Sequence, residues 1–84
     1  MYLEVLSPGK TIFSGNIKLI KVPGSGGSFE VMNNHAPLIS TLDEGKVKVE
    51  IDEHTIRMFN ISGGVIQVVA NKIIVLAESI TDAN

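Results

Sequence analysis

Residues Val65 to Ala77 read VIQVVANKIIVLA, two apolar runs separated by the short polar pair Asn71-Lys72. Both runs are rich in β-branched side chains, which favour strands over helices. A short polar connection between two such runs is typical of a β-hairpin. The stretch therefore predicts one strand over Val65–Ala70, a tight turn, and a second strand over Ile73–Glu78.

This predicted hairpin is apolar on both of its faces. Ten of the thirteen residues are apolar, and in the first strand they divide between the two side-chain parities: Val65 and Val69 on one, Ile66 and Val68 on the other. A sheet with one wet face would alternate apolar and polar residues instead. Either a small closed barrel leaves some apolar area exposed, or a partner protein covers an outer face or an edge. We favour the partner, because long exposed strands otherwise promote aggregation.

The rest of the chain repeats a pattern of short β-rich runs followed by turn signals. Residues Lys46–Ile51 alternate cleanly between polar and apolar side chains, which predicts a half-buried strand. The regular spacing predicts an all-β sandwich or barrel of about eight to ten strands with little or no helix, save for one possible turn over Asn33–Ala36. The other predicted strands are Tyr2–Ser7, Thr11–Val22 with a bend near Gly15, Ser28–Met32, Leu38–Leu42 and Thr55–Ile61.

Length and composition exclude several classes of protein. The 84 residues are expected to form one domain, residues 1–84, and the net charge of −2 gives no argument for binding nucleic acid. No window approaches the roughly 18 apolar residues of a membrane-spanning helix, so we expect no direct membrane insertion, and the opening MYLEVLSPGK lacks the features of a secretory signal. The absence of cysteine removes disulfides and thiolate chemistry and fits a reducing compartment.

The glycine-rich loop Gly24-Ser25-Gly26-Gly27-Ser28 does not fit a phosphate-binding motif. It lacks the lysine followed by Ser or Thr of a Walker loop, and it leads into the extended run that begins at Phe29 rather than into a helix. The loop is therefore interpreted as an inter-strand connection whose small polar tip suits contact with another protein.

No catalytic or metal site is indicated. His35 and His54 form no metal motif, and no Ser, His and Asp are grouped by their spacing. His35 is interpreted as a locally hydrogen-bonded turn residue, with a partner-binding role as the alternative. The sequence thus predicts a protein that is not an enzyme and has no cofactor.

Four segments in register resemble one family. They are Phe13-Ser14-Gly15, His35-Ala36-Pro37-Leu38, Ser62-Gly63-Gly64 and the closing Val75-Leu76-Ala77-Glu78. The chain resembles, over about residues 2 to 80, the N-terminal β-sandwich domain of the epsilon subunit of bacterial-type F-type ATP synthases, called delta in mitochondria.

The resemblance implies a fold, a place and a set of contacts. The fold would be a ten-stranded flattened barrel of two five-stranded sheets. The place would be the rotor stalk, where the domain couples the gamma shaft to the c-ring, peripheral to the cytoplasmic side of the bacterial inner membrane. The c-ring contact would comprise Ser25, Gly26, Gly27, Ser28 and Phe29. The gamma contact would comprise His35, Ala36, Pro37, Leu38, Val68 and Leu76.

The sequence departs from the family pattern in three places. Asn33-Asn34 replaces the usual proline-glycine pair, although asparagine tolerates the left-handed region. Ser28 stands where an acidic residue is common. The chain also ends at Asn84, before the two-helix hairpin of longer relatives, so no ATP binding and no inhibition by such a hairpin are expected.

A carrier domain of the lipoyl or biotinyl type is the alternative hypothesis. Such domains are also small and all-β, and they carry a modified lysine at a hairpin tip, the position that Lys72 would occupy. The neighbours Asn71 and Ile73 lack the acidic or methionine character of carrier domains.

Overall fold

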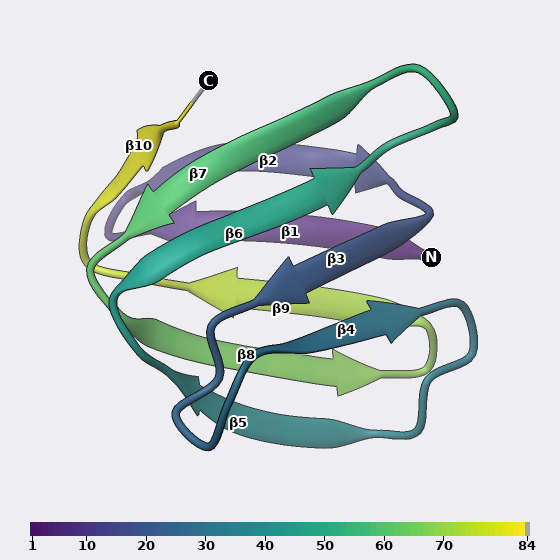
Figure 1. Cartoon of the computed structure of the whole chain (residues 1–84), viewed down its shortest axis with the longest axis horizontal. Helices are drawn as coiled ribbons and strands as arrows, with labels where there is room; N and C mark the ends of the chain where they lie inside the picture. Colours follow the sequence, from purple (N-terminus) through teal and green to yellow (C-terminus); the bar gives the residue numbers. More distant parts are fainter. Residues whose placement is uncertain (84) are drawn as a thin grey trace.

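The computed structural model describes residues 1–83 as two five-stranded sheets packed face to face (Figure 1). Sheet 1 has the strand order β2-β1-β9-β8-β5, and sheet 2 has the order β10-β7-β6-β3-β4. Only β1 and β9 pair in parallel within the described chain. The strands are β1 (Tyr2–Ser7), β2 (Lys10–Asn16), β3 (Leu19–Val22), β4 (Phe29–Met32), β5 (Leu38–Leu42), β6 (Gly45–Glu50), β7 (Ile56–Ile61), β8 (Gly64–Val69), β9 (Lys72–Leu76) and β10 (Ile80–Asp82).

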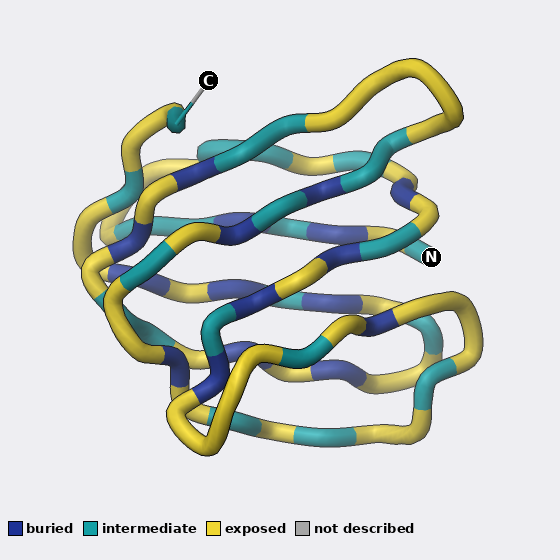
Figure 2. The backbone as a smooth tube through the Cα atoms, viewed as in Figure 1, coloured by how far each residue is buried: buried dark blue, intermediate teal, exposed yellow. Residues whose placement is uncertain are grey.

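Alternate side chains of both sheets meet in one core. The dark segments of Figure 2 recur along each central strand with the period of two that a strand imposes. Phe59 is the largest fully buried side chain, and no polar or charged residue of the described chain is buried. The fully buried members are Leu3, Val5, Ile66, Val68, Ile73 and Val75 from sheet 1, and Ile20, Val22, Val31, Val47, Val49 and Phe59 from sheet 2.

The predicted all-β sandwich of two five-stranded sheets is confirmed, and residues 1–83 contain no helix. The bounds of Tyr2–Ser7 and Leu38–Leu42 are those expected from the sequence. At 33–34 the chain makes a turn, and Asn34 has a φ of 64°, in the left-handed region that asparagine tolerates.

Two strand predictions are wrong. The single long strand Thr11–Val22 is divided, because the chain crosses from sheet 1 to sheet 2 at Ile17 and Lys18. Ile17 is 5% exposed and caps the core, so the crossing leaves no polar signal in the sequence. The irregularity in the β1–β2 register lies at Ile12, where Val5 pairs with Phe13 and Leu6 with Thr11, rather than at Gly15.

The connections gather at two opposite ends of the sandwich (Figure 1). The β3–β4 loop, which contains GSGGS, lies at one end of β4, and the turn over residues 33–37 follows its other end. The β8–β9 hairpin lies at the same end as this turn, drawn at the right of Figure 1. The fold therefore separates the two segments that the resemblance implicates in binding by the length of one strand.

Candidate protein-docking surfaces

The outer face of sheet 1 is apolar, and we call it the sheet 1 face. Strand pairing places Leu6, Leu76 and Val65 in one row and Ile74, Gln67 and Ile39 in the next. Ile39 is 73% exposed and Leu76 49% exposed, although both are large apolar side chains. The apolar members of the face are Tyr2, Leu6, Ile39, Val65, Val69, Ile74 and Leu76.

The charges on this face neutralise each other. Along β1, β9, β8 and β5 the outward-facing charged side chains are Glu4 and Lys72, whose carboxylate and ammonium groups lie 3.2 Å apart. The Lys72 ammonium also lies 6.0 Å from the ring centroid of Tyr2. A protein that covers this face would contact apolar side chains and an ion pair, Glu4–Lys72, whose two charges already neutralise each other.

The outer face of sheet 2 carries both charged and apolar side chains, and its Met32 and Ile56 are 55% and 50% exposed. Lys21 pairs across the strands with both Lys48 and Glu30, and Lys48 forms an ion pair with Glu50 at 3.6 Å. The exposed Lys46 continues this pattern along β6. The sheet 2 face is therefore more highly charged than the sheet 1 face, and the outward-facing apolar side chains of β8 and β9 lie on the sheet 1 face.

The predicted gamma contact residues of β8 and β9 lie on different sides of sheet 1. Leu76 points outward, whereas Val68 is 1% exposed and packs in the core. Val68 thus offers no surface to a partner and leaves the contact set. Val68 is predicted as a contact because alternate residues on both faces of β8 are apolar. The sequence alone therefore does not tell which set faces the core. The exposed members of β8 are Val65, Gln67 and Val69.

The predicted contact segment His35–Leu38 connects β4 to β5 and reaches the edge of sheet 1. Ala36 and Pro37 are exposed, His35 is half-buried, and Leu38 packs against the core. The imidazole Nδ1 of His35 donates to the carbonyl oxygen of Ala36 at 2.7 Å, which is the local hydrogen bond expected of a turn residue. The segment therefore forms a rim beside Ile39.

The glycine-rich loop has an exposed tip on an anchored base. Ser25 donates its backbone N–H to the Thr41 carbonyl at 3.0 Å, and the Thr41 hydroxyl donates to Ser25 Oγ at 2.9 Å. A Cβ atom at Gly24 would lie 2.6 Å from the Phe29 ring, so only glycine allows this packing. Ser25 to Ser28 are exposed, while Phe29 is half-buried against the core.

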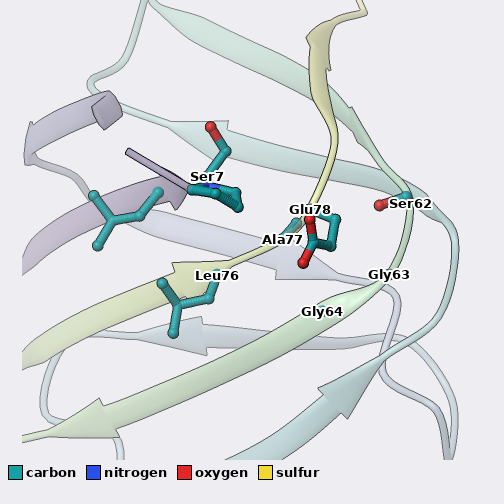
Figure 3. A pocket seen from close by; sticks show the side chains of 9 residues that line it. Ser7, Ser62, Gly63, Gly64, Leu76, Ala77 and Glu78 are labelled. Atoms are coloured by element: carbon teal, nitrogen blue, oxygen red, sulfur yellow. The ribbon is translucent and has the colours of Figure 1, made fainter. Parts of the chain in front are cut away.

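A shallow depression of about 480 Å³ lies where β9 leaves sheet 1 (Figure 3). The side chains of Leu6 and Leu76 line it, together with the backbone of Gly63 and Gly64 and the carboxylate-bearing Glu78. Its hydroxyls belong to Ser7 and Ser62. No histidine lines it, so it holds no pairing of a nucleophile with an imidazole base.

Titratable groups form no reactive cluster in the described chain. No three His, Asp or Glu residues among 1–83 gather as metal ligands. The backbone N–H of His54 donates to the Asp52 carboxylate at 2.8 Å and holds the pKa of Asp52 below its usual value, as in an ordinary turn.

The carrier hypothesis is not supported. Lys72 begins β9, and its side chain lies over the sheet 1 face beside Glu4 and Tyr2 instead of extending from a hairpin tip. The tip itself is formed by Ala70 and Asn71, with φ angles of 49° and 63°. A carrier lysine must reach out of its domain, and this one is held against its own sheet.

The fold and its surfaces define a small ten-stranded β-sandwich with one apolar outer face, one outer face of mixed charged and apolar side chains, and an anchored glycine-rich loop. The family model of the ATP synthase delta/epsilon chain β-sandwich domain matches residues 1–83. The chain belongs to this family. Within its described residues no helix has the length and apolar character to cross a membrane.

Individual proteins agree with this assignment. The chain is 38% identical to the ATP synthase epsilon chain of Chlorobaculum tepidum over 94% of its own length and 90% of that protein. In fold it is similar to a chain in the mitochondrial ATP synthase of Euglena gracilis, with a TM-score of 0.90 and 18% identity, covering 95% of this chain and 51% of that one. A chain in the central stalk and c-ring structure of the Tetrahymena thermophila enzyme gives a TM-score of 0.84 at 18% identity, covering 98% and 66% respectively.

Proposed function

We propose that this chain is the epsilon-type subunit of the ATP synthase rotor stalk, where it holds the gamma shaft to the c-ring. Proton flow turns the ring, and a stiff domain bound to both partners transmits the rotation. Catalysis belongs to other subunits, and the chain works as a peripheral component on the cytoplasmic side of the bacterial inner membrane. Close packing of the sandwich interior supplies the stiffness.

The apolar sheet 1 face is the observation that carries the proposal. Gamma binds this face, with Leu76, Val65 and Ile39 as the apolar contacts and the segment His35–Leu38 at its rim. Stable interfaces bury about 800 Å² on each partner. One face of a body measuring 27 × 27 × 24 Å has about that area. The sheet 2 face, which is the more highly charged of the two, remains in water.

The c-ring contact lies at the loop end of the sandwich. The exposed residues Ser25, Gly26, Gly27 and Ser28 meet the polar loops of the ring, and Phe29 anchors the loop from behind. Because this loop and the turn after β4 lie at opposite ends of that strand, the chain can hold both partners at once. Small polar side chains suit a contact between two loops.

Calorimetric titration of the full chain with purified gamma tests the proposal. Gln67→Glu places a charge at the centre of the sheet 1 face without changing shape, and we expect a loss of affinity of at least tenfold, because gamma would have to take the added carboxylate out of water. Asn60→Asp adds the same charge to the sheet 2 face and should bind like the unmodified chain. Equal affinity for both variants, or no binding by the unmodified chain, contradicts the proposal.

A further inference from the structure

The turn over residues 33–37 is held in place by the amide side chain of one distant residue. The backbone N–H of Asn34 donates to Asn71 Oδ1 at 2.9 Å, and Asn71 Nδ2 donates to Asn33 Oδ1 at 2.8 Å. The residues involved are 37 and 38 positions apart in sequence. One primary amide thus uses both its acceptor and its donor on the same turn.

The turn has little else to hold it. Its other hydrogen bonds in the described chain are local: His35 N–H to the Met32 carbonyl at 3.2 Å, and the His35 imidazole to the Ala36 carbonyl at 2.7 Å. Ala36 and Pro37 are exposed, and Pro37 has no N–H to donate. Without the Asn71 amide, the segment between β4 and β5 would be attached by its two ends and by half-buried His35.

Asn71 itself is firmly placed. It occupies the second position of the β8–β9 hairpin tip with a φ of 63°, and Ala70 precedes it with a φ of 49°. The Asn71 carbonyl accepts the backbone N–H of Tyr2 at 3.1 Å, which ties the tip to the start of β1. Figure 1 shows the hairpin tip and the β4–β5 connection at the same end of the molecule.

We infer that Asn71 is a positioning residue that holds the segment His35–Pro37 in the conformation in which it binds gamma. The inference rests on the proposed function, because that function makes the segment the rim of the gamma site. Asn71 contacts the turn through Asn33 and Asn34 and needs no contact with gamma itself. Ordering a binding segment in advance raises affinity by lowering the entropy lost on association.

Variants at the hairpin tip separate this role from general stability. Asn71→Gly removes the amide but retains a residue that readily adopts positive φ. Ala70→Gly makes the same change one position earlier and leaves both amide hydrogen bonds intact, so it is the matched control. Asn71→Asp keeps the acceptor for Asn34, and the Asn33 amide can rotate so that its NH₂ group donates to the new carboxylate.

Amide hydrogen exchange and gamma titration of the full-length variants decide the matter. Asn71→Gly should speed exchange of the Asn34 amide and weaken gamma binding about tenfold, a loss appropriate to two neutral hydrogen bonds. Ala70→Gly should change neither quantity, and Asn71→Asp should restore most of the affinity. Both variants should remain folded, and Asn71→Gly should have the lower midpoint of urea unfolding, because it alone loses the two hydrogen bonds.

Two results would overturn the inference: unchanged exchange at Asn34 in Asn71→Gly, or faster exchange with undiminished gamma affinity. Failure of the proposed function gives a different pattern, in which the unmodified chain does not bind gamma at all. In that case the exchange rate of Asn34 still reports whether Asn71 orders the turn, and the binding role assigned to that order is wrong.

Discussion

The Cα atom of Gly64 lies so close to the carbonyl oxygen of Leu76 that a Cβ atom on Gly64 would overlap that oxygen. Strand β8 begins at this point, and the next residue, Val65, pairs with Leu76. The two strands that build most of the sheet 1 face therefore meet through a contact that only glycine permits. Figure 3 shows Gly64 and Leu76 side by side at the edge of the depression.

Replacement of Gly64 by alanine should destabilise the fold. The added methyl group must displace backbone atoms, and we expect a loss of about 1–3 kcal/mol in the free energy of unfolding. Gly26→Ala is the control, because no atom lies within 4 Å of its Cβ position. It should shift stability by less than about 0.5 kcal/mol. Urea unfolding measures both, and equal effects would show that the close contact is not needed.

Arg57 should stabilise the fold more through its contacts with aromatic rings than through its ion pair with Asp82. Its guanidinium carbon lies 4.9 Å from the ring centroid of Phe59 and 5.7 Å from that of Phe13, and Nη2 lies 3.0 Å from Asp82 Oδ1. The Asp82 side chain is 67% exposed, so the pair contributes at most about 1 kcal/mol.

Asp82→Ala should therefore cost less stability than Arg57→Ala, which also removes the packed stem and the cation–π contacts. Urea unfolding at low and at 1 M salt distinguishes the two contributions, because salt weakens only the exposed pair. A larger loss in Asp82→Ala would mean that the ion pair is the main contribution.

The turn between β6 and β7 should add a small pH dependence below the usual aspartate range. Hydrogen bonds from His54 and Thr55 lower the pKa of Asp52 in the folded state. A depressed folded pKa gives stability that is fully present above the unfolded pKa of about 4 and is lost as pH falls through the folded pKa. Asp52→Asn keeps an acceptor but does not titrate. The difference in melting temperature between the two proteins should shrink only in that acidic window, and a constant difference would contradict the assignment.

Single cysteines can map the two docking surfaces, since the chain contains no cysteine of its own. Ser28→Cys carries a photoreactive maleimide at the loop tip, and Ile39→Cys carries it on the sheet 1 face. In the assembled ATP synthase, the first should cross-link to the c-ring and the second to gamma. Exposed Ser62→Cys, at the loop end but outside the glycine-rich loop, is a control for reach. If Ser28→Cys cross-links to gamma and Ile39→Cys to the c-ring, the proposed orientation of the chain is wrong.

The fold could be predicted largely from the sequence because period-two patterns and turn residues mark most strands. Lys46–Ile51 shows this best, since its inward Val47 and Val49 alternate with charged side chains. The division of Thr11–Val22 could not be seen, because the crossing residue Ile17 is as apolar as the strands it joins. The sequence gives no clear sign of β10, because Ile80–Asp82 is short and its pairing with β7 is long-range.

The site could be predicted only in part. Apolarity on both parities of β8 indicated a covered outer face, but it could not tell that Val65 faces out and Val68 faces in. That distinction comes from the register of β8 with β5 and β9. The role of Asn71 was hidden for a similar reason: its partners lie 37 and 38 residues away, and sequence spacing gives no sign of such a contact.

A cryo-EM structure of the ATP synthase assembled with this chain tests the central claim most directly. We predict that gamma covers the side chains of Leu76, Val65 and Ile39, that the loop 25–28 touches the c-ring, and that Lys21 and Lys48 face water. A map in which gamma lies against the outer face of sheet 2, while Leu76 and Ile39 are open to solvent, would contradict the claim.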